Sequence, residues 1–260
     1  MQQALPQSIV FMTGTFISHA CWVEWIAYFE KKGYKCIAPA WPHKDASAED
    51  LRNTHYNASI ATNRLESITE YFAGIVAALP EKPILIGHSL GGLVVQFLLQ
   101  RGLASAGVAV HSFPPAGVSS FRFSLLRTMW EAMSFFTSSK KSYMVPFRKW
   151  KRSFANNLSC EQQKEFYYKY AIPESKGIIR DVFKCTTRVN FRKAHAPLLF
   201  TSGGRDRVIP PCVNYVNQGR YKNVESTIAH KHFKDHGHLV FDPPAAKEEA
   251  EFIHAWLQRR

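Results

Sequence analysis

The 260-residue chain lacks several features that define other classes of protein. No apolar run approaches the roughly 18 residues that a membrane-spanning helix requires. Residues 1–7 carry neither the basic nor the apolar part of a secretion signal. We therefore expect a cytoplasmic protein with no integral membrane segment. No Pro-, Gly- or Ser-rich linker and no internal repeat divides the chain, so we expect one large domain.

Cysteine is scarce, and its spacing is irregular. The cysteines are odd in number and show no paired spacing: Cys21, Cys36, Cys160, Cys185 and Cys212. This pattern argues against a disulfide framework and against a structural zinc site. Four histidines crowd residues 230–238, but no carboxylate or cysteine stands at a convincing ligand spacing from them. We therefore expect no metal site.

Acidic residues are few, with 20 Asp and Glu against 33 Lys and Arg and a formal net charge of +13. Residues 113–190 supply most of this excess, with 14 basic and 5 acidic residues. The densest basic group is interleaved with aromatic residues and consists of Lys140, Lys141, Arg148, Lys149, Lys151 and Arg152. A solvated surface is one interpretation, and attraction to an acidic partner, an acidic substrate or an anionic membrane surface is another. No nucleic-acid-binding motif accompanies the charge, so we expect no nucleic-acid partner.

Hydrophobic residues make up 46% of the chain, which is enough for a buried core. Segments typical of strands alternate with segments typical of helices. The predicted strands are residues 8–13, 34–40, 83–86, 107–113, 197–202 and 224–229. The predicted helices are residues 21–32, 60–79, 93–99, 212–218 and 245–258. This alternation predicts an α/β fold with a mostly parallel sheet flanked by helices.

One motif carries chemistry at a defined place in this pattern. Gly87-His88-Ser89-Leu90-Gly91 follows the buried strand at 83–86 and precedes the apolar helix at 93–99. Small residues on both sides of a serine allow a sharp strand-to-helix turn that exposes the hydroxyl above a helix N-terminus. The alternative is an ordinary tight turn, but its position between strand and helix favours Ser89 as a nucleophile.

In this context the motif resembles the nucleophile elbow of the α/β-hydrolase family. The resemblance runs from near residue 8 to the C-terminus and is weakest between residues 113 and 190. It places the chain in the serine hydrolase branch, similar to esterases and lipases, with an inserted lid. It implies a core formed by residues 1–112 and 191–260 and a helical lid or cap formed by residues 113–190.

The resemblance also implies an acid and a base, in the chain order Ser, Asp, His. Asp206 follows the strand at 197–202 and a glycine turn, like the acid of the family, although it could instead cap the next helix. His238 follows Gly237 ahead of the terminal helix, like the base of the family. His236 is the alternative base. We interpret His88 as a packed, hydrogen-bonded residue and Asp235 as a loop or capping residue.

The oxyanion hole is expected to use two backbone amides. One belongs to Leu90, the residue after the nucleophile, and the other to Thr15 in the loop after the first strand. The family usually has His-Gly where this chain has Thr13-Gly14. This difference affects the support of the loop rather than the donor.

The predicted lid is expected to contain helices at residues 125–136 and 160–170 and to cover the site. Its aromatic residues would partly pack the lid onto the core and partly line an apolar pocket: Trp130, Phe135, Phe136, Tyr143, Phe147, Trp150, Phe154 and Tyr167. The predicted substrate is therefore a small to medium apolar or amphipathic acyl compound.

The predicted activity is hydrolysis of an ester or thioester through an acyl-enzyme, and it requires no cofactor. Three other reactions use the same triad, namely carbon–carbon bond hydrolysis, acyl transfer and perhydrolysis, and the fold does not choose among them. A non-catalytic ligand-binding protein on this fold is a further alternative. A serine nucleophile disfavours the dehalogenase and epoxide-hydrolase branches, whose chemistry requires a carboxylate.

Overall fold

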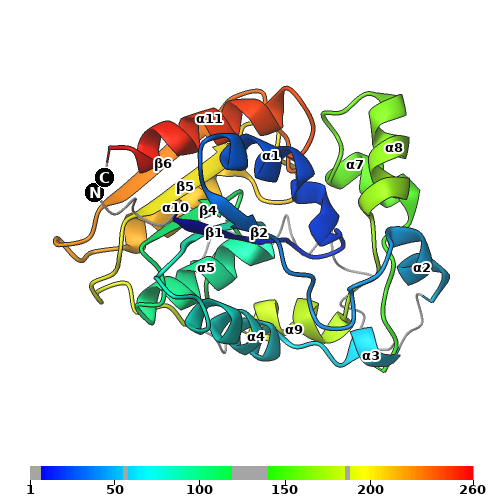
Figure 1. The fold of residues 1–260 in the computed structure, drawn as a ribbon. Helices are drawn as coiled ribbons and strands as arrows, with labels where there is room; N and C mark the ends of the chain where they lie inside the picture. Colours follow the sequence, from blue (N-terminus) through cyan, green and yellow to red (C-terminus); the bar gives the residue numbers. More distant parts are fainter. Residues whose placement is uncertain (1–6, 55–57, 119–139, 185–187, 260) are drawn as a thin grey trace.

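The computed structural model describes residues 7–54, 58–118, 140–184 and 188–259. Its centre is a six-stranded sheet in the order β2-β1-β3-β4-β5-β6, in which every neighbouring pair is parallel (Figure 1). The strands are β1 (Ser8–Met12), β2 (Lys35–Ile37), β3 (Ile84–His88), β4 (Ala106–Val110), β5 (Leu198–Gly203) and β6 (Ile228–Phe233). All residues of β3, β4 and β5 are buried, as expected for parallel strands that helices cover on both faces.

Helices cover both faces of this sheet. One face carries α1 (Val23–Lys31) and α11 (Ala245–Leu257), which lie side by side in Figure 1 and contact each other. The opposite face carries α4 (Leu65–Ala77), α5 (Leu90–Gln100) and α10 (Pro211–Arg220). Asn217 and Tyr221 of the α10 segment donate hydrogen bonds to the side chain of Gln96 on α5, which fixes α10 on the same face. Within the described part of the chain, none of the helices is both long and apolar enough to cross a bilayer.

Among the described residues of the segment between β4 and β5, three helices are found. They are α7 (Phe147–Ser153), α8 (Cys160–Tyr170) and α9 (Lys176–Lys184). Shorter elements between β1 and α4 are the 3-10 helix η1 (His19–Trp22), α2 (Ala48–Asn53) and α3 (Ala58–Ala61). Backbone hydrogen bonds from Ser18 to Tyr170 and from Ile172 to Phe16 join the end of α8 to the loop after β1.

A buried ion pair joins the same segment to the loop after β2. Lys44 Nζ lies 2.5 Å from Glu174 Oε2, and both side chains are almost fully buried. Burial lowers the pKa of Lys44, while the charge of Glu174 opposes this change. The second oxygen of Glu174 accepts a hydrogen bond from the backbone N–H of Ser175. Removal of one partner would leave the other charge buried without a counter-ion.

The predicted fold class is confirmed, and two predicted elements are wrong. The last strand begins at Ile228 rather than at Val224, whose side chain is 97% exposed. The predicted helix at 60–79 is split into α3 and α4. The second helix starts anew because Asp181, from α9, accepts a hydrogen bond from the backbone N–H of Leu65. The predicted helix at 160–170 is confirmed as α8, and the one at 125–136 lies outside the described residues.

The Glu174→Gln variant tests the role of the buried ion pair. We expect it to lose about 3 kcal/mol of unfolding free energy, because Lys44 stays buried without a counter-ion. The matched control is Glu70→Gln, which removes an exposed ion pair with Arg101 and is expected to cost less than about 1 kcal/mol. Urea denaturation at pH 7 measures both changes. Equal losses in the two variants would contradict this account.

Candidate active site

Ser89 lies in a sharp turn between β3 and α5 at the carboxyl edge of the sheet. Its φ of 55° and ψ of −116° lie outside the regions that a non-glycine residue normally adopts. Two glycines make this turn possible. A Cβ at Gly87 would lie 2.2 Å from the carbonyl oxygen of Gly91. A Cβ at Gly91 would lie 2.1 Å from the carbonyl oxygen of Met12. The strand, the helix and the loop after β1 therefore approach one another more closely than side chains would allow.

In the predicted triad, His238 lies within hydrogen-bond distance of both Ser89 and Asp206. His238 Nε2 lies 3.2 Å from Ser89 Oγ, and His238 Nδ1 lies 2.8 Å from Asp206 Oδ2. Ser89, Asp206 and His238 are all buried. With Nδ1 protonated, His238 donates to Asp206 and can accept the serine proton at Nε2. The structure thus brings together the predicted nucleophile, base and acid from positions far apart in the sequence.

The Asp206 carboxylate is held by donors on both of its oxygens. Oδ1 accepts hydrogen bonds of 2.8 Å from the backbone N–H groups of Val208 and Ile209. Burial alone would raise the pKa of Asp206, but the neighbouring imidazoles of His238 and His111 outweigh it and hold this pKa well below its usual range. Asp206 therefore stays an anion and can orient His238 and stabilise it when it becomes protonated.

The alternative base His236 and the two residues interpreted as structural, Asp235 and His88, bond to other partners. His236 contacts glutamates at both ring nitrogens, with Nδ1 3.0 Å from Glu249 Oε1 and Nε2 2.9 Å from Glu248 Oε2. Asp235 is exposed and pairs with Arg205 at the surface. His88 lies behind the site, where its Nε2 donates a 2.8 Å hydrogen bond to the carbonyl of His238, and burial lowers its pKa well below its usual value.

The remaining two histidines of the 230–238 cluster are residues of β6 rather than of a loop. Both contact Ser202 Oγ, His230 through Nε2 at 2.9 Å and His232 through Nδ1 at 3.2 Å. Among the described residues, the group of three side chains that could hold a metal is His111, Asp206 and His238, with ligand atoms within 4.8 Å of one another. Asp206 and His238 already bond to each other there, an arrangement that suits proton transfer.

Two buried residues that were not predicted from the sequence extend the site beyond Asp206. His111 directly follows β4, and its Nε2 lies 2.9 Å from Glu249 Oε1 on α11. Its Nδ1 lies 3.5 Å from Asp206 Oδ2, a charge contact rather than an aligned hydrogen bond. A histidine directly after a buried strand, at the edge where Ser89 leaves the sheet, is a signal that could have identified His111. Glu249 could have been noticed as an acidic residue among the buried Ala246, Ala250 and Ile253 of α11.

The opposite charges of His111 and Glu249 stabilise each other. Burial alone would lower the pKa of His111, but the charge of Glu249 and the contacts with both carboxylates raise it to about 10. Burial alone would raise the pKa of Glu249, but His111 and His236 lower it to about 2. Thr201 Oγ donates a 3.0 Å hydrogen bond to the other oxygen of Glu249. At neutral pH, His111 is therefore a buried cation between two buried carboxylates.

The loop after β1 lies against the nucleophile. A Cβ at Gly14 would lie 2.6 Å from Ser89 Cβ and 3.2 Å from its hydroxyl, so only glycine allows this approach. The adjoining Thr15 is buried, and its hydroxyl has no hydrogen-bond partner within the part of the chain that the structure describes. Leu90, the first residue of α5, follows Ser89 directly. Leu90 thus adjoins the nucleophile in the chain, and Thr15 adjoins Gly14, which lies against the nucleophile.

Aromatic side chains from the segment between β4 and β5 contact residues of the site. The ring of Phe154 lies 5.6 Å from that of His238 and stacks on Trp150 at 4.9 Å. Tyr143 and Phe154 each contact the ring of Phe16 in the loop after β1. Tyr167 of the same segment contacts the rings of Phe147 and Trp150. Trp130, Phe135 and Phe136 lie outside the described residues.

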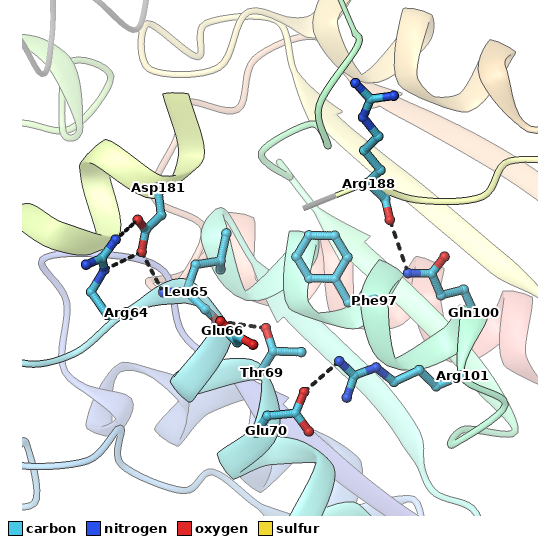
Figure 2. Close-up of a pocket in the computed structure, with 10 residues that line it drawn as sticks. All are labelled: Arg64, Leu65, Glu66, Thr69, Glu70, Phe97, Gln100, Arg101, Asp181 and Arg188. Carbon is cyan, nitrogen blue, oxygen red and sulfur yellow. Dashed lines mark hydrogen bonds and ion pairs between the residues drawn. The ribbon is translucent and has the colours of Figure 1, made fainter. Parts of the chain in front are cut away.

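The molecule also has a hollow that lies away from the predicted triad. Figure 2 shows it between α4, α5 and α9, lined by charged side chains that pair within the lining, Arg64 with Asp181 and Glu70 with Arg101. None of Ser89, Asp206 and His238 lines this hollow.

Comparison with known proteins identifies the family of this fold and site. Residues 9–250 match the family described as the alpha/beta hydrolase family. The chain therefore belongs to the alpha/beta hydrolase family, and we classify it as a hydrolase. A search of curated proteins finds no match.

Solved structures share the fold over nearly their whole length. The monoacylglycerol lipase of Paleococcus ferrophilus is similar at 19% identity and a TM-score of 0.68, covering 98% of this chain and 95% of the lipase. A methylesterase from Arabidopsis is similar at 13% identity and a TM-score of 0.66, covering 96% and 98%. Tomato methylketone synthase I complexed with 2-tridecanone is similar at 12% identity and a TM-score of 0.67, covering 98% and 99%. At these identities the likeness shows the shared fold.

The buried charge of His111 predicts how stability depends on pH. Its pKa is about 10 in the folded protein against an ordinary value of 6.5, so its contribution is complete below about pH 6.5 and is lost as the pH rises through about 10. We expect the unfolding free energy to fall by about 1 kcal/mol per pH unit between pH 7 and 8.5. His111→Gln should flatten this slope. Urea denaturation at several pH values measures it.

The control for this measurement is His19→Gln. Burial lowers the pKa of His19, so this residue titrates below pH 7 and should leave the slope unchanged. The same slope in His111→Gln as in the unmodified protein would contradict the assignment of a buried cation.

Proposed function

We propose that this protein is a serine hydrolase that cleaves an ester or thioester of a small to medium apolar substrate. The observation that carries this proposal is the uninterrupted chain of contacts from Ser89 Oγ through His238 to Asp206. A lone serine is a weak nucleophile, and it requires both a base within reach and a group that orients the base. The membership in the alpha/beta hydrolase family is consistent with this reading.

The proposed reaction transfers an acyl group to water in two steps. His238 accepts the Ser89 proton as the hydroxyl attacks the substrate carbonyl, and Asp206 stabilises the resulting imidazolium. His238 then returns the proton to the leaving alcohol or thiol, which leaves an acyl-enzyme on Ser89. A water molecule, deprotonated by the same histidine, attacks the acyl-enzyme; the bond to the Ser89 oxygen breaks as His238 returns the proton to that oxygen, and the acid is released. The catalytic residues return to their starting protonation states.

The oxyanion of both tetrahedral intermediates would be held by the backbone amides of Leu90 and Thr15. Support comes from the position of Leu90 at the N-terminus of α5, where unpaired N–H groups and the helix dipole favour negative charge. The contact of Gly14 with Ser89 brings the loop that carries Thr15 to the same place. The substrate carbonyl would therefore enter between this loop and α5.

In this proposal, residues 113–190 act as the lid on a core formed by residues 1–112 and 191–260. The contacts of Phe154 with His238 and Phe16 support an apolar surface next to the reacting groups. Such a surface favours an apolar or amphipathic acyl group over a polar one. The names of similar structures, a monoacylglycerol lipase and a methylesterase, agree with an ester substrate.

The basic residues of α7 lie on the outer side of this cover. Arg148, Lys151 and Arg152 are exposed, whereas Trp150 of the same helix is fully buried. We infer that this face attracts anionic or amphipathic substrates, or an anionic surface that presents them, toward the site beneath. This attraction would weaken as salt screens the charges.

Hydrolysis of p-nitrophenyl esters tests the proposed activity. We expect the protein to hydrolyse short- or medium-chain esters and Ser89→Ala to lose about 1,000-fold or more of kcat, because the acyl-enzyme cannot form. Ser67→Ala, an exposed serine on α4, is the matched control and should keep full activity. A panel of acetyl to decanoyl esters, together with one acyl thioester, covers the proposed substrate range.

Equal rates for the unmodified protein and Ser89→Ala on every ester and thioester would contradict the proposal. Such a result would instead favour the non-catalytic ligand-binding alternative.

A further inference from the structure

A line of buried titratable groups continues past the triad into the core. From Asp206 it passes to His111 and on to Glu249, with contacts of 3.5 and 2.9 Å. The side chains of these three residues are fully buried. Glu249 also contacts Nδ1 of His236 at 3.0 Å, and His236 reaches the exposed Glu248. The triad mechanism uses only the first member of this line.

His111 compensates the charges of two buried carboxylates. Two ionised carboxylates, Asp206 and Glu249, lie near each other in a region without water contact, where an unpaired charge is costly. A cation between them compensates both. Without it, the two carboxylates would repel each other. His111 occupies the position where a single imidazolium can serve both.

The backbone and packing fix His111 in this position. Its φ of 44° is in the left-handed region, which a non-glycine residue adopts only under strong constraint. Its N–H donates a hydrogen bond to the carbonyl of Thr201 on β5. A Cβ at Gly203 would lie 2.7 Å from His111 Cε1, so the ring packs directly over a glycine backbone. Several independent contacts thus hold the ring between the two carboxylates.

We propose that His111 is a positioning residue for the triad, and that the buried His111–Glu249 pair fixes Asp206 and sets the pH range over which His238 works as a base. This inference rests on the proposed function, because it assigns a role to residues behind the proposed triad. His111 acts through Asp206 and does not touch the reacting atoms.

The electrostatic consequence has a definite sign. A ring nitrogen of His111 and one of His238 lie within 4.8 Å of each other. The positive charge of His111 therefore opposes protonation of His238, and Glu249, farther away, offsets part of this effect. Loss of the cation alone should make His238 easier to protonate. Loss of the cation together with Glu249 should change the ease of protonating His238 much less.

Other titratable groups face the same region and must stay constant in the test. His88, at the end of β3, has its ring 6.5 Å from that of His111 and is held neutral by burial. His230 on β6 also senses the charge of His111, and burial lowers its pKa to about 4. Neither changes its charge state near neutral pH. His236 and Glu248 complete the set, beyond Glu249.

The test compares kcat/KM for a p-nitrophenyl ester between pH 5 and 9 in four proteins: the unmodified chain, His111→Gln, the double variant His111→Gln/Glu249→Gln, and His254→Gln. The acid limb of this profile reports protonation of the essential base. We expect its midpoint to rise by about 1 pH unit in His111→Gln. The double variant should return to within about 0.3 pH units of the unmodified protein, because it removes the pair as a neutral unit.

The control variant lies on the same helix as Glu249. His254 packs against the rings of Tyr28 and Tyr34, far along α11 from the triad, so His254→Gln should leave the midpoint unchanged. If His111→Gln does not fold, as urea denaturation would show, His111→Asn removes the same charge with a smaller side chain and takes its place.

The outcomes separate this inference from the proposed function. An active unmodified protein whose midpoint is the same in all variants, even with reduced kcat, would show that His111 only supports the structure and would overturn the inference alone. A midpoint that rises equally in the single and double variants would also overturn it. A protein that hydrolyses no ester or thioester would overturn the proposed function and this inference together.

Discussion

The buried carboxylate of Asp206 is the group on which the rest of the site depends. A charge without water contact persists only when all of its oxygens are bonded and opposite charge is near. Two backbone amides hold Oδ1, His238 holds Oδ2, and His111 adds a cation at 3.5 Å. His111 in turn requires Glu249 to stay charged in the core. The orientation of the proposed base is therefore set by a chain of paired charges that extends from the sheet edge to α11.

The parallel sheet explains how these residues come together. Neighbouring parallel strands end at one edge, and here β3, β4 and β5 are adjacent, with His88 opposite Val110 and Val110 opposite Thr201. Ser89, His111 and Asp206 follow the ends of these three strands and so converge although more than a hundred residues separate the first from the last. The glycines at 87, 91 and 203 allow the close approaches that this convergence requires.

Much of the fold could be predicted from the sequence, because strand and helix periodicity is local and the family order of Ser89, Asp206 and His238 is readable along the chain. The triad itself stays a proposal that the geometry supports. The split of the helix at 60–79 could not be predicted, because the residue that caps the second helix, Asp181, lies 116 residues from Leu65. The pairing of His111 with Glu249 spans 138 residues, and neither residue type indicates a buried partner by itself.

Labelling with a fluorophosphonate probe, followed by mass spectrometry of the tryptic peptides, tests whether His238 activates Ser89 as a nucleophile. We expect one covalent adduct per chain, located on Ser89, which the unmodified protein forms and which is lost or strongly slowed in His238→Ala. This result would show that the serine is activated by this histidine. An adduct on another residue, or labelling of Ser89 at an undiminished rate in His238→Ala, would contradict it.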